Sequence, residues 1–401
     1  MTDPEPPPEM RLLLACARKK LSAFHPEHIV ELCHRPLDWR LFLNLVDRHR
    51  VAPLVWHSLH AVDPLRLPDT VRDALRRRVE YNTRRMLLLG AELSRLVRLL
   101  EQAGIRVMPL KGPVLALQVY GNLALRHAGD LDLLVDPCCV QKARQVLADA
   151  DYIQTHPPFE LTPVQTAAFM KIHHDFGYTH KSQDIYVELH WRWSENAYLF
   201  PLNFEQIWHK RQSLIIAGVR MAVMAPEDLL PYLCVHGAKH AWFRLRWLCD
   251  IAELLDNGFS IDMDRLIERS NKLGVSRMLA QGLLLAHQVL NAPLPASVSQ
   301  VIQQDSTVRT LAQVAYQALM QDERYWLPTA TLLTKPKRML YLLRLRTDLK
   351  YKWYSLFHRL LNIEDWQTIR LPAWLFALYF ILRPLLWIDR QLKKHYRRSN
   401  R

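Results

Sequence analysis

Two carboxylates separated by one residue, Asp130 and Asp132, begin a short apolar run with the composition of a buried strand. Because successive side chains of a strand point to opposite faces, both acids are predicted to project from one face, with Leu131 and Leu133 toward the core. Such oxygen ligands suit Mg²⁺ or Mn²⁺, and Mg²⁺ commonly binds one or two carboxylates together with substrate phosphates. For an isolated Asp-x-Asp, two solvated acids at a strand end are the better interpretation.

The segment upstream of the two acids has the pattern of a strand, a tight turn and a helix. Lys111 is followed by Gly112 and Pro113; glycine permits an unusual backbone conformation, and proline suits the first helical position. A helix N-terminus offers free N–H groups to an anion, and Lys111 adds a charge beside it. Arg126, four residues before Asp130, could supply a planar phosphate clamp. Considered alone, Lys111 or Arg126 is best interpreted as a surface charge. The combination of both cations with the acid pair favours a phosphate site.

A third carboxylate is expected on a neighbouring strand if the site is to hold metal ions. In the segment 184–191, Val187 and Leu189 are predicted to face the core, which places Glu188 and His190 on the opposite face. This segment and the strand-like run before it form a plausible hairpin. If its strand lies beside that of the acid pair, Glu188 completes the metal site. When Glu188 is considered alone, a solvated glutamate on an exposed strand face is as good an interpretation as a metal ligand.

Several histidines raise the question of a zinc site. His236 and His240 have the spacing of a zinc-protease helix, but Gly237 stands where that motif carries its glutamate. The simple zinc-protease interpretation is therefore excluded, and a pair of ordinary helical histidines is the simplest alternative. His173 and His174 are interpreted as ordinary hairpin residues.

Taken together, these residues resemble the nucleotidyltransferase-like proteins of the DNA polymerase β superfamily, in particular a branch found in bacterial exopolysaccharide and peptide-product gene clusters. The resemblance covers roughly residues 100 to 260 and rests on these motifs: Leu110-Lys111-Gly112, Tyr120-Gly121, Arg126, the run 130–135, Glu188-Leu189-His190-Trp191, the run 236–240 and the run 247–250. Lys111-Gly112-Pro113 replaces the usual Gly-Ser or Gly-Gly pair. The resemblance implies an α+β fold, a polymerase-β-like core with a mixed sheet flanked by helical regions.

The resemblance also implies a metal-dependent reaction in which an acceptor oxygen attacks the α-phosphorus of a nucleoside triphosphate and pyrophosphate leaves. Catalysis and binding of Mg²⁺ or Mn²⁺ are assigned to three carboxylates: Asp130, Asp132 and Glu188. The nucleotide phosphates are assigned to Lys111, Gly112 and Arg126. The acceptor pocket is assigned to His190, His236 and His240. The acceptor is a hydroxyl or phosphate, with a sugar or a lipid-linked molecule as the expectation. The alternative is a non-catalytic binding or scaffold protein of a membrane-associated biosynthetic complex.

At 401 residues, half of them hydrophobic, the chain is predicted to form several domains. Apolar periodicity and helix breakers divide it into an N-terminal helical region (1–103), a mixed strand and helix region (104–225), a helical domain (226–334) and a basic, aromatic-rich helical tail (335–401). The resemblance implies that the region 104–225 is the nucleotidyltransferase-like core. The first residues lack the pattern of a secretory signal, which favours a cytoplasmic protein.

The tail carries most of the net charge. It contains 16 Lys and Arg against 4 Asp and Glu, which accounts for +12 of the chain's +14. Cations alternate with aromatic residues, as in the run 350–354. A helical cap on the catalytic region with affinity for the inner face of the membrane is favoured over binding of single-stranded nucleic acid, which no accompanying motif supports. The charge-free run 371–382 is shorter than the roughly 20 residues that cross a bilayer.

Overall fold

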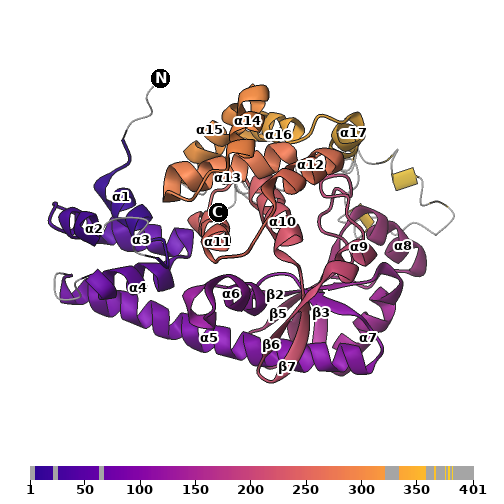
Figure 1. Ribbon diagram of the computed structural model, residues 1–401. Coiled ribbons are helices and arrows are strands. Elements are labelled where there is room, and N and C mark those ends of the chain that lie inside the picture. The colour runs from indigo at the N-terminus through magenta and orange to yellow at the C-terminus, as the bar shows by residue number, and fades with distance from the viewer. Residues whose placement is uncertain are drawn as a thin grey trace, which may run out of the picture.

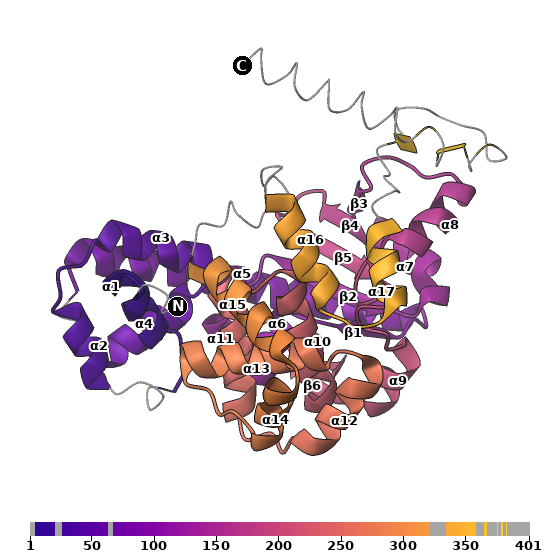
Figure 2. The same cartoon turned by 90° about the horizontal axis from the view of Figure 1, so that it is seen from above.

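The computed structural model describes residues 5–20, 26–62, 67–320 and 334–357, together with positions 365–366, 375, 378–379 and 382. These residues form a mixed α/β fold in which helices predominate around one five-stranded sheet. Helices that precede and follow the sheet in the chain lie on different sides of it, as Figures 1 and 2 show. The predicted α+β class is confirmed.

The described residues before the sheet form five helices: α1 (Pro8–Ala15), α2 (Pro26–Cys33), α3 (Trp39–His49), α4 (Ala52–Val62) and α5 (Asp69–Gln102). Asp38 caps α3, because its side chain accepts hydrogen bonds from the backbone N–H groups of Arg40 and Leu41. Helix α5 runs beneath both the N-terminal helices and the sheet in Figure 1. Its buried Met86 and Leu89 belong to the hydrophobic core of the sheet, so this single helix joins the two parts.

The sheet has the strand order β1-β2-β5-β4-β3. Its strands are β1 (Val107–Pro109), β2 (Asp130–Val135), β3 (Tyr152–His156), β4 (Asp175–His180) and β5 (Tyr186–His190). Strands β2 and β5 are parallel and the other neighbours are antiparallel, so the sheet is mixed, as predicted. The connections carry α6 (Pro113–Tyr120), α7 (Val140–Asp149), α8 (Pro163–Ile172) and the short 3₁₀ turns η3 (Leu123–Leu125) and η4 (Pro137–Cys139).

The two faces of the sheet differ in chemistry. Leu131, Leu133, Val187 and Leu189 are buried in the core that α5 and α7 share with the sheet. Their alternate neighbours on β2 and β5 project to the opposite face, toward α10. The alternation predicted from the sequence is confirmed for both strands, and it leaves the acids on the side where a cavity forms.

Helix α9 (Phe204–Lys210) and the hairpin of β6 (Gln212–Ile216) and β7 (Val219–Val223) lead into the C-terminal helices. These are α10 (Pro226–Lys239), α11 (Leu245–Asp256), α12 (Met263–Leu273), α13 (Ser276–Leu290), α14 (Ala296–Gln304), α15 (Ser306–Met320), α16 (Thr334–Arg344) and α17 (Leu349–Phe357). Helix α13 packs against α10, α11 and α15. Within the described ranges, no helix combines the length and the hydropathy needed to cross a bilayer. Most of the run 371–382, and of the basic tail after Phe357, lies outside the described residues.

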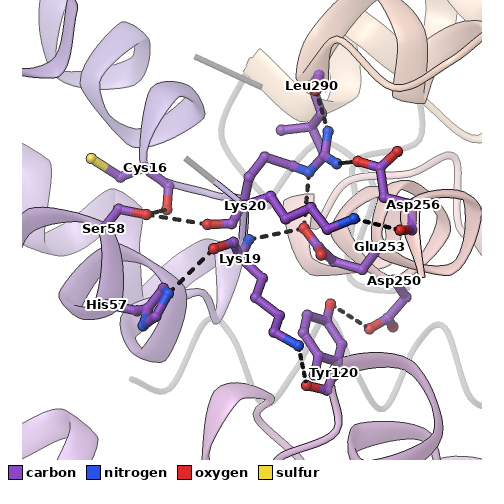
Figure 3. A network of polar contacts seen from close by, with 11 residues as sticks. Cys16, Lys19, Lys20, His57, Ser58, Tyr120, Asp250, Glu253, Asp256 and Leu290 are labelled. Carbon is purple, nitrogen blue, oxygen red and sulfur yellow. Dashed lines mark hydrogen bonds and ion pairs between the residues drawn. The ribbon is translucent and has the colours of Figure 1, made fainter. Parts of the chain in front are cut away.

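A buried polar network fixes the segment after α1 against α11. Arg18 is 1% exposed; its Nε donates to Glu253 Oε1 at 2.9 Å, and its guanidinium also pairs with Asp256. The backbone N–H of Lys19 donates to Glu253 at 2.9 Å, and its Nζ donates to the carbonyl of Tyr120 at 2.8 Å (Figure 3). Because Tyr120 ends α6, the network joins the N-terminal helices to two elements that flank the sheet.

A second buried contact joins α3 to the start of α11. His49 is fully buried, and its Nδ1 accepts a hydrogen bond from the backbone N–H of Leu245 at 3.1 Å. Burial, reinforced by the charges of Arg48 and Arg244, lowers the pKa of His49 from 6.5 to about 3. The folded protein therefore keeps this imidazole neutral well below neutral pH.

Lowering the pH is expected to destabilise the fold through His49. Between pH 6.5 and 3 the unfolded chain protonates this residue and the folded chain does not, so the free energy of unfolding falls as the pH falls. At pH 5 the loss is about 2 kcal/mol, at about 1.4 kcal/mol per pKa unit. Urea unfolding at pH 7 and pH 5 measures it. His49→Gln is expected to lose about 2 kcal/mol less than the native chain; equal losses would contradict the assignment.

Candidate active site

The acid pair and Glu188 lie on neighbouring parallel strands. The register sets Asp132 on β2 directly beside Glu188 on β5, and Asp130 beside Tyr186. All four side chains line the same cavity. The strand adjacency on which the third-carboxylate prediction depended is therefore present, and it brings Glu188 beside two acids that lie far from it in the chain.

Asp132 is the most buried of these acids, at 3% exposed, and it is the centre of a polar cluster. Its Oδ1 lies 3.1 Å from Lys111 Nζ and 3.1 Å from His190 Nε2, which lies 3.2 Å from Glu188 Oε2. Burial favours the neutral acid, but Lys111 and His190 outweigh it and hold the pKa of Asp132 well below its usual range. Burial also opposes a charge on His190, but Asp132 and Glu188 raise its pKa to about 9.

The predicted turn between strand and helix is present at Lys111-Gly112-Pro113. Gly112 has a φ of +64°, which other residues rarely adopt, and a Cβ there would lie 3.3 Å from the carbonyl oxygen of Asp130. Pro113 is the first residue of α6. The turn thus brings the Lys111 ammonium group to Asp132 and leaves Gly112 on the cavity wall.

Arg126 lies in a buried, two-pronged ion pair. Its Nε donates to Asp250 Oδ1 at 2.8 Å and its Nη2 donates to Asp250 Oδ2 at 3.0 Å. Tyr120 also donates to Asp250, at 2.9 Å, as Figure 3 shows. Arg126 is 5% exposed but still lines the cavity. The sequence did not predict that two of its donors, on Nε and Nη2, are used by a carboxylate of α11.

His236 and His240 line the same cavity, from the last turn of α10 and its C-cap. Their rings lie 5.0 Å apart, and both pack on Trp247. Burial, assisted by nearby lysines, lowers the pKa of each histidine well below its usual value. A Cβ on Gly237 would overlap the ring of Trp242, which explains why a glycine stands where a zinc-protease helix carries glutamate.

The cavity has a volume of about 780 Å³ and lies between the sheet, α10, α11 and the α16–α17 region. Besides Lys111 and Arg126, its wall carries cations to which sequence reasoning gave no role: Arg50, Lys239, Arg244, Arg246 and Arg338. Burial and neighbouring arginines lower the pKa of Arg246 to about 9, and burial and Lys111 lower that of Lys239. Because their surroundings disfavour these charges, the wall suits an anionic ligand.

Two groups of side chains among the described residues have the geometry to hold a metal ion. One consists of Asp132, Glu188 and His190, and the other of His174, Asp175 and His190; in each, one ligand atom per residue lies within 4.8 Å of the others. The carboxylate oxygens of the first group fit Mg²⁺, and Asp130 projects from the same face of β2. The Lys111 ammonium group already places one positive charge beside Asp132.

A comparison with protein families shows the family to which the chain belongs. A family model described as an uncharacterised nucleotidyltransferase matches residues 35–291, which is more than half of the chain. The chain belongs to this nucleotidyltransferase family. Comparisons with curated proteins and with solved structures found no match. The nucleotidyltransferase part of the predicted resemblance is confirmed, and the gene-cluster association stays a prediction.

The part of the chain that matches the nucleotidyltransferase family extends from the residues before α3 to the end of α13. It contains the acids of β2 and β5, the Lys111-Gly112-Pro113 turn and the cavity-lining ends of α10 and α11. The wall contributed by Arg338 of α16 and Tyr351 of α17 lies outside the match. Family membership therefore covers the acid cluster, while the far wall of the cavity is a feature of this chain's C-terminal helices.

Proposed function

We propose that the protein is a metal-dependent nucleotidyltransferase, which moves a nucleoside monophosphate from a nucleoside triphosphate to a hydroxyl or phosphate acceptor and releases pyrophosphate. The observation that carries the proposal is the parallel register that sets Asp132 beside Glu188, with Asp130 on the same face, in a cavity rich in cations. A scaffold has no need to hold mutually repelling acids together in a cavity. The family match supports the same conclusion.

The reaction assigns the carboxylates two tasks. The acceptor oxygen forms a bond to the α-phosphorus, the bond from that phosphorus to the bridging oxygen breaks, and pyrophosphate leaves with the electron pair. We assign receipt of the acceptor's proton to Glu188, whose side chain is 29% exposed at the cavity. Asp130, Asp132 and Glu188 would hold Mg²⁺ or Mn²⁺, which supplies positive charge to the attacked phosphate and to the leaving pyrophosphate.

The remaining cations and histidines divide the cavity between nucleotide and acceptor. Lys111 and Gly112, at the start of α6, and the partly shielded Arg126 would neutralise the phosphates, with Lys239 and Arg246 adding charge from α10 and α11. His236 and His240 are kept uncharged by burial, so they offer neutral hydrogen-bonding groups to an acceptor hydroxyl. His190 lies between the two regions, because it contacts Asp132 and Glu188.

The acceptor is proposed to be a sugar or a lipid-linked molecule reached at the inner face of the membrane. Support comes from α17, where Leu349, Trp353 and Leu356 recur at helical spacing and are 70, 58 and 46% exposed. Lys350 is exposed beside them. Exposed apolar side chains next to cations suit the surface of an anionic bilayer. Liposome binding that depends on Trp353 would support this contact.

Calorimetry with the four ribonucleoside triphosphates, in Mg²⁺ or Mn²⁺, tests the proposed function directly. We expect one nucleotide to bind only when metal is present, because its phosphates share the ion with the carboxylates. The Asp130→Asn, Asp132→Asn double variant is expected to lose this metal-dependent binding. The absence of binding to the native chain, with and without a sugar phosphate as trial acceptor, would favour the scaffold alternative instead.

A further inference from the structure

Three side chains next to the acid cluster form a nitrogen-rich group. His174 precedes β4, Asp175 begins that strand, and the antiparallel register pairs Asp175 with His190 at the end of β5. One ligand atom from each residue lies within 4.8 Å of the others, and the two imidazole rings are 5.3 Å apart. All three residues line the cavity. The sequence by itself predicted only an ordinary hairpin histidine at position 174.

Two nitrogen atoms of this group are buried without a hydrogen-bond partner among the described residues: His174 Nδ1 and His190 Nδ1. His174 Nδ1 lies 2.9 Å from Asp175 Oδ1, a contact that is an ion pair when the imidazole is protonated but that lacks the angles of a well-formed hydrogen bond. His190 is 4% exposed. Buried polar atoms are nearly always hydrogen-bonded, so two unpartnered nitrogens in one group need an explanation. His174 Nδ1 and Asp175 Oδ1 are close enough to bind the same ion.

The contacts of His190 orient its second nitrogen. Its Nε2 makes a hydrogen bond with Asp132 at 3.1 Å. When a metal ion binds, Nε2 keeps the proton that it donates to Asp132, and Nδ1 is the nitrogen that gives up its proton and offers its lone pair to the ion. A carboxylate that accepts a hydrogen bond from one imidazole nitrogen while the other nitrogen binds metal is the usual way in which proteins orient a ligating histidine.

We propose that His174, Asp175 and His190 bind a divalent transition-metal ion of the zinc class. Two imidazole nitrogens and one carboxylate oxygen suit Zn²⁺, whereas Mg²⁺ requires oxygen ligands. Three protein ligands leave a coordination position open to the cavity, as in catalytic rather than structural zinc sites. His190 also contacts Asp132 and Glu188, so this site adjoins the proposed Mg²⁺ site, but its other two ligands are separate from the three carboxylates and it does not rest on nucleotidyl transfer.

Zinc binding by the untagged full-length chain tests the proposal. The chain is stripped of metal with a chelator and titrated with Zn²⁺ in excess Mg²⁺, and bound zinc is counted after dialysis. Asp175→Asn and His174→Gln each remove a ligand. Loss of an outer-shell partner costs about 10- to 100-fold in metal affinity, so loss of a ligand is expected to weaken binding by more than about 100-fold.

Two control variants separate this site from others. His209→Gln changes a histidine whose side chain is 80% exposed, and Asp130→Asn alters the acid pair without touching the three ligands. Both are expected to keep one zinc ion. The proposal is overturned if the native chain binds no zinc in Mg²⁺, or if the ligand variants bind it as tightly. If those variants unfold, X-ray absorption at the zinc edge is measured on the native chain with zinc bound. A spectrum without scattering from imidazole ligands overturns the proposal.

Discussion

Replacing Asp132 with asparagine is expected to lower turnover by at least about 10³-fold, because removing even one neutral donor that stabilises transition-state charge costs about 10²–10³-fold. Asp132 lies directly beside Glu188 and is in contact with Lys111 and His190. Asparagine keeps the size of the side chain and one oxygen, but it removes the negative charge that a divalent cation requires. Turnover is measured as pyrophosphate released from the nucleotide that calorimetry identifies, with sugar phosphates and lipid-linked sugars as trial acceptors.

Asp136→Asn is the matched control, because Asp136 follows the same strand but does not line the cavity. Its Oδ1 accepts a hydrogen bond from the backbone N–H of Cys138, and it pairs with Arg106. Its turnover is expected to stay close to that of the native chain. Native turnover in Asp132→Asn would contradict the site assignment, and an equal loss in Asp136→Asn would show that the effect arises from the fold.

A lower turnover of Asp132→Asn could arise from a less stable fold, so its stability is measured separately from its catalytic activity. The substitution leaves the Lys111 ammonium group without its carboxylate partner, and removing one member of a buried ion pair is destabilising. Adding Lys111→Met removes the stranded charge, so the double variant is expected to regain stability while its turnover stays low. Circular dichroism and urea unfolding measure the first property, and pyrophosphate release measures the second.

Local patterns in the sequence were sufficient to predict the elements that carry the acids. The alternation around Asp130 and Asp132 gave the correct strand and the correct faces, and Gly112-Pro113 gave the start of α6. The reason is that strand alternation and helix-start preferences depend on neighbouring residues only. The pairing of Asp132 with Glu188 could not be predicted, and the metal site was therefore predicted only on the assumption that their strands are neighbours. The reason is that register depends on how distant segments pack.

The parts of the site that could not be predicted all depend on long-range contacts. Asp250 holds Arg126 from a position 124 residues away, and nothing near either residue signals the pair. Lys239 and Arg246 line the cavity because the end of α10 and the start of α11 meet there. The only local sign was a lysine within the histidine motif at 236–240 and basic residues soon after it, a pattern that is equally typical of a solvated surface.

Arg18→Met is expected to destabilise the protein by about 3–5 kcal/mol, the cost of breaking a buried ion pair by removing one partner. Glu253 is only 3% exposed and loses the 2.9 Å contact to Arg18 Nε, so its charge is left buried without that partner. Asp256, which is 26% exposed, loses the same guanidinium group. Urea unfolding measures the change. Arg35→Met, which removes the exposed pair with Glu31, is the control and is expected to have little effect.

A double-mutant cycle shows whether the cost lies in the stranded Glu253 charge or in lost packing. If the cost lies in the charge, adding Glu253→Gln to Arg18→Met removes the unpaired buried carboxylate. The double variant is then more stable than the sum of the two single changes predicts, by about 0.5–3 kcal/mol. The glutamine side chain would still offer an oxygen to the backbone N–H of Lys19, which donates to Glu253 in the native chain. Additive losses would contradict the ion-pair explanation. Glu253 shares α11 with Asp250, the carboxylate that holds Arg126 at the cavity, so a positive coupling would measure an energetic link between the N-terminal segment and a helix that carries part of the candidate active site.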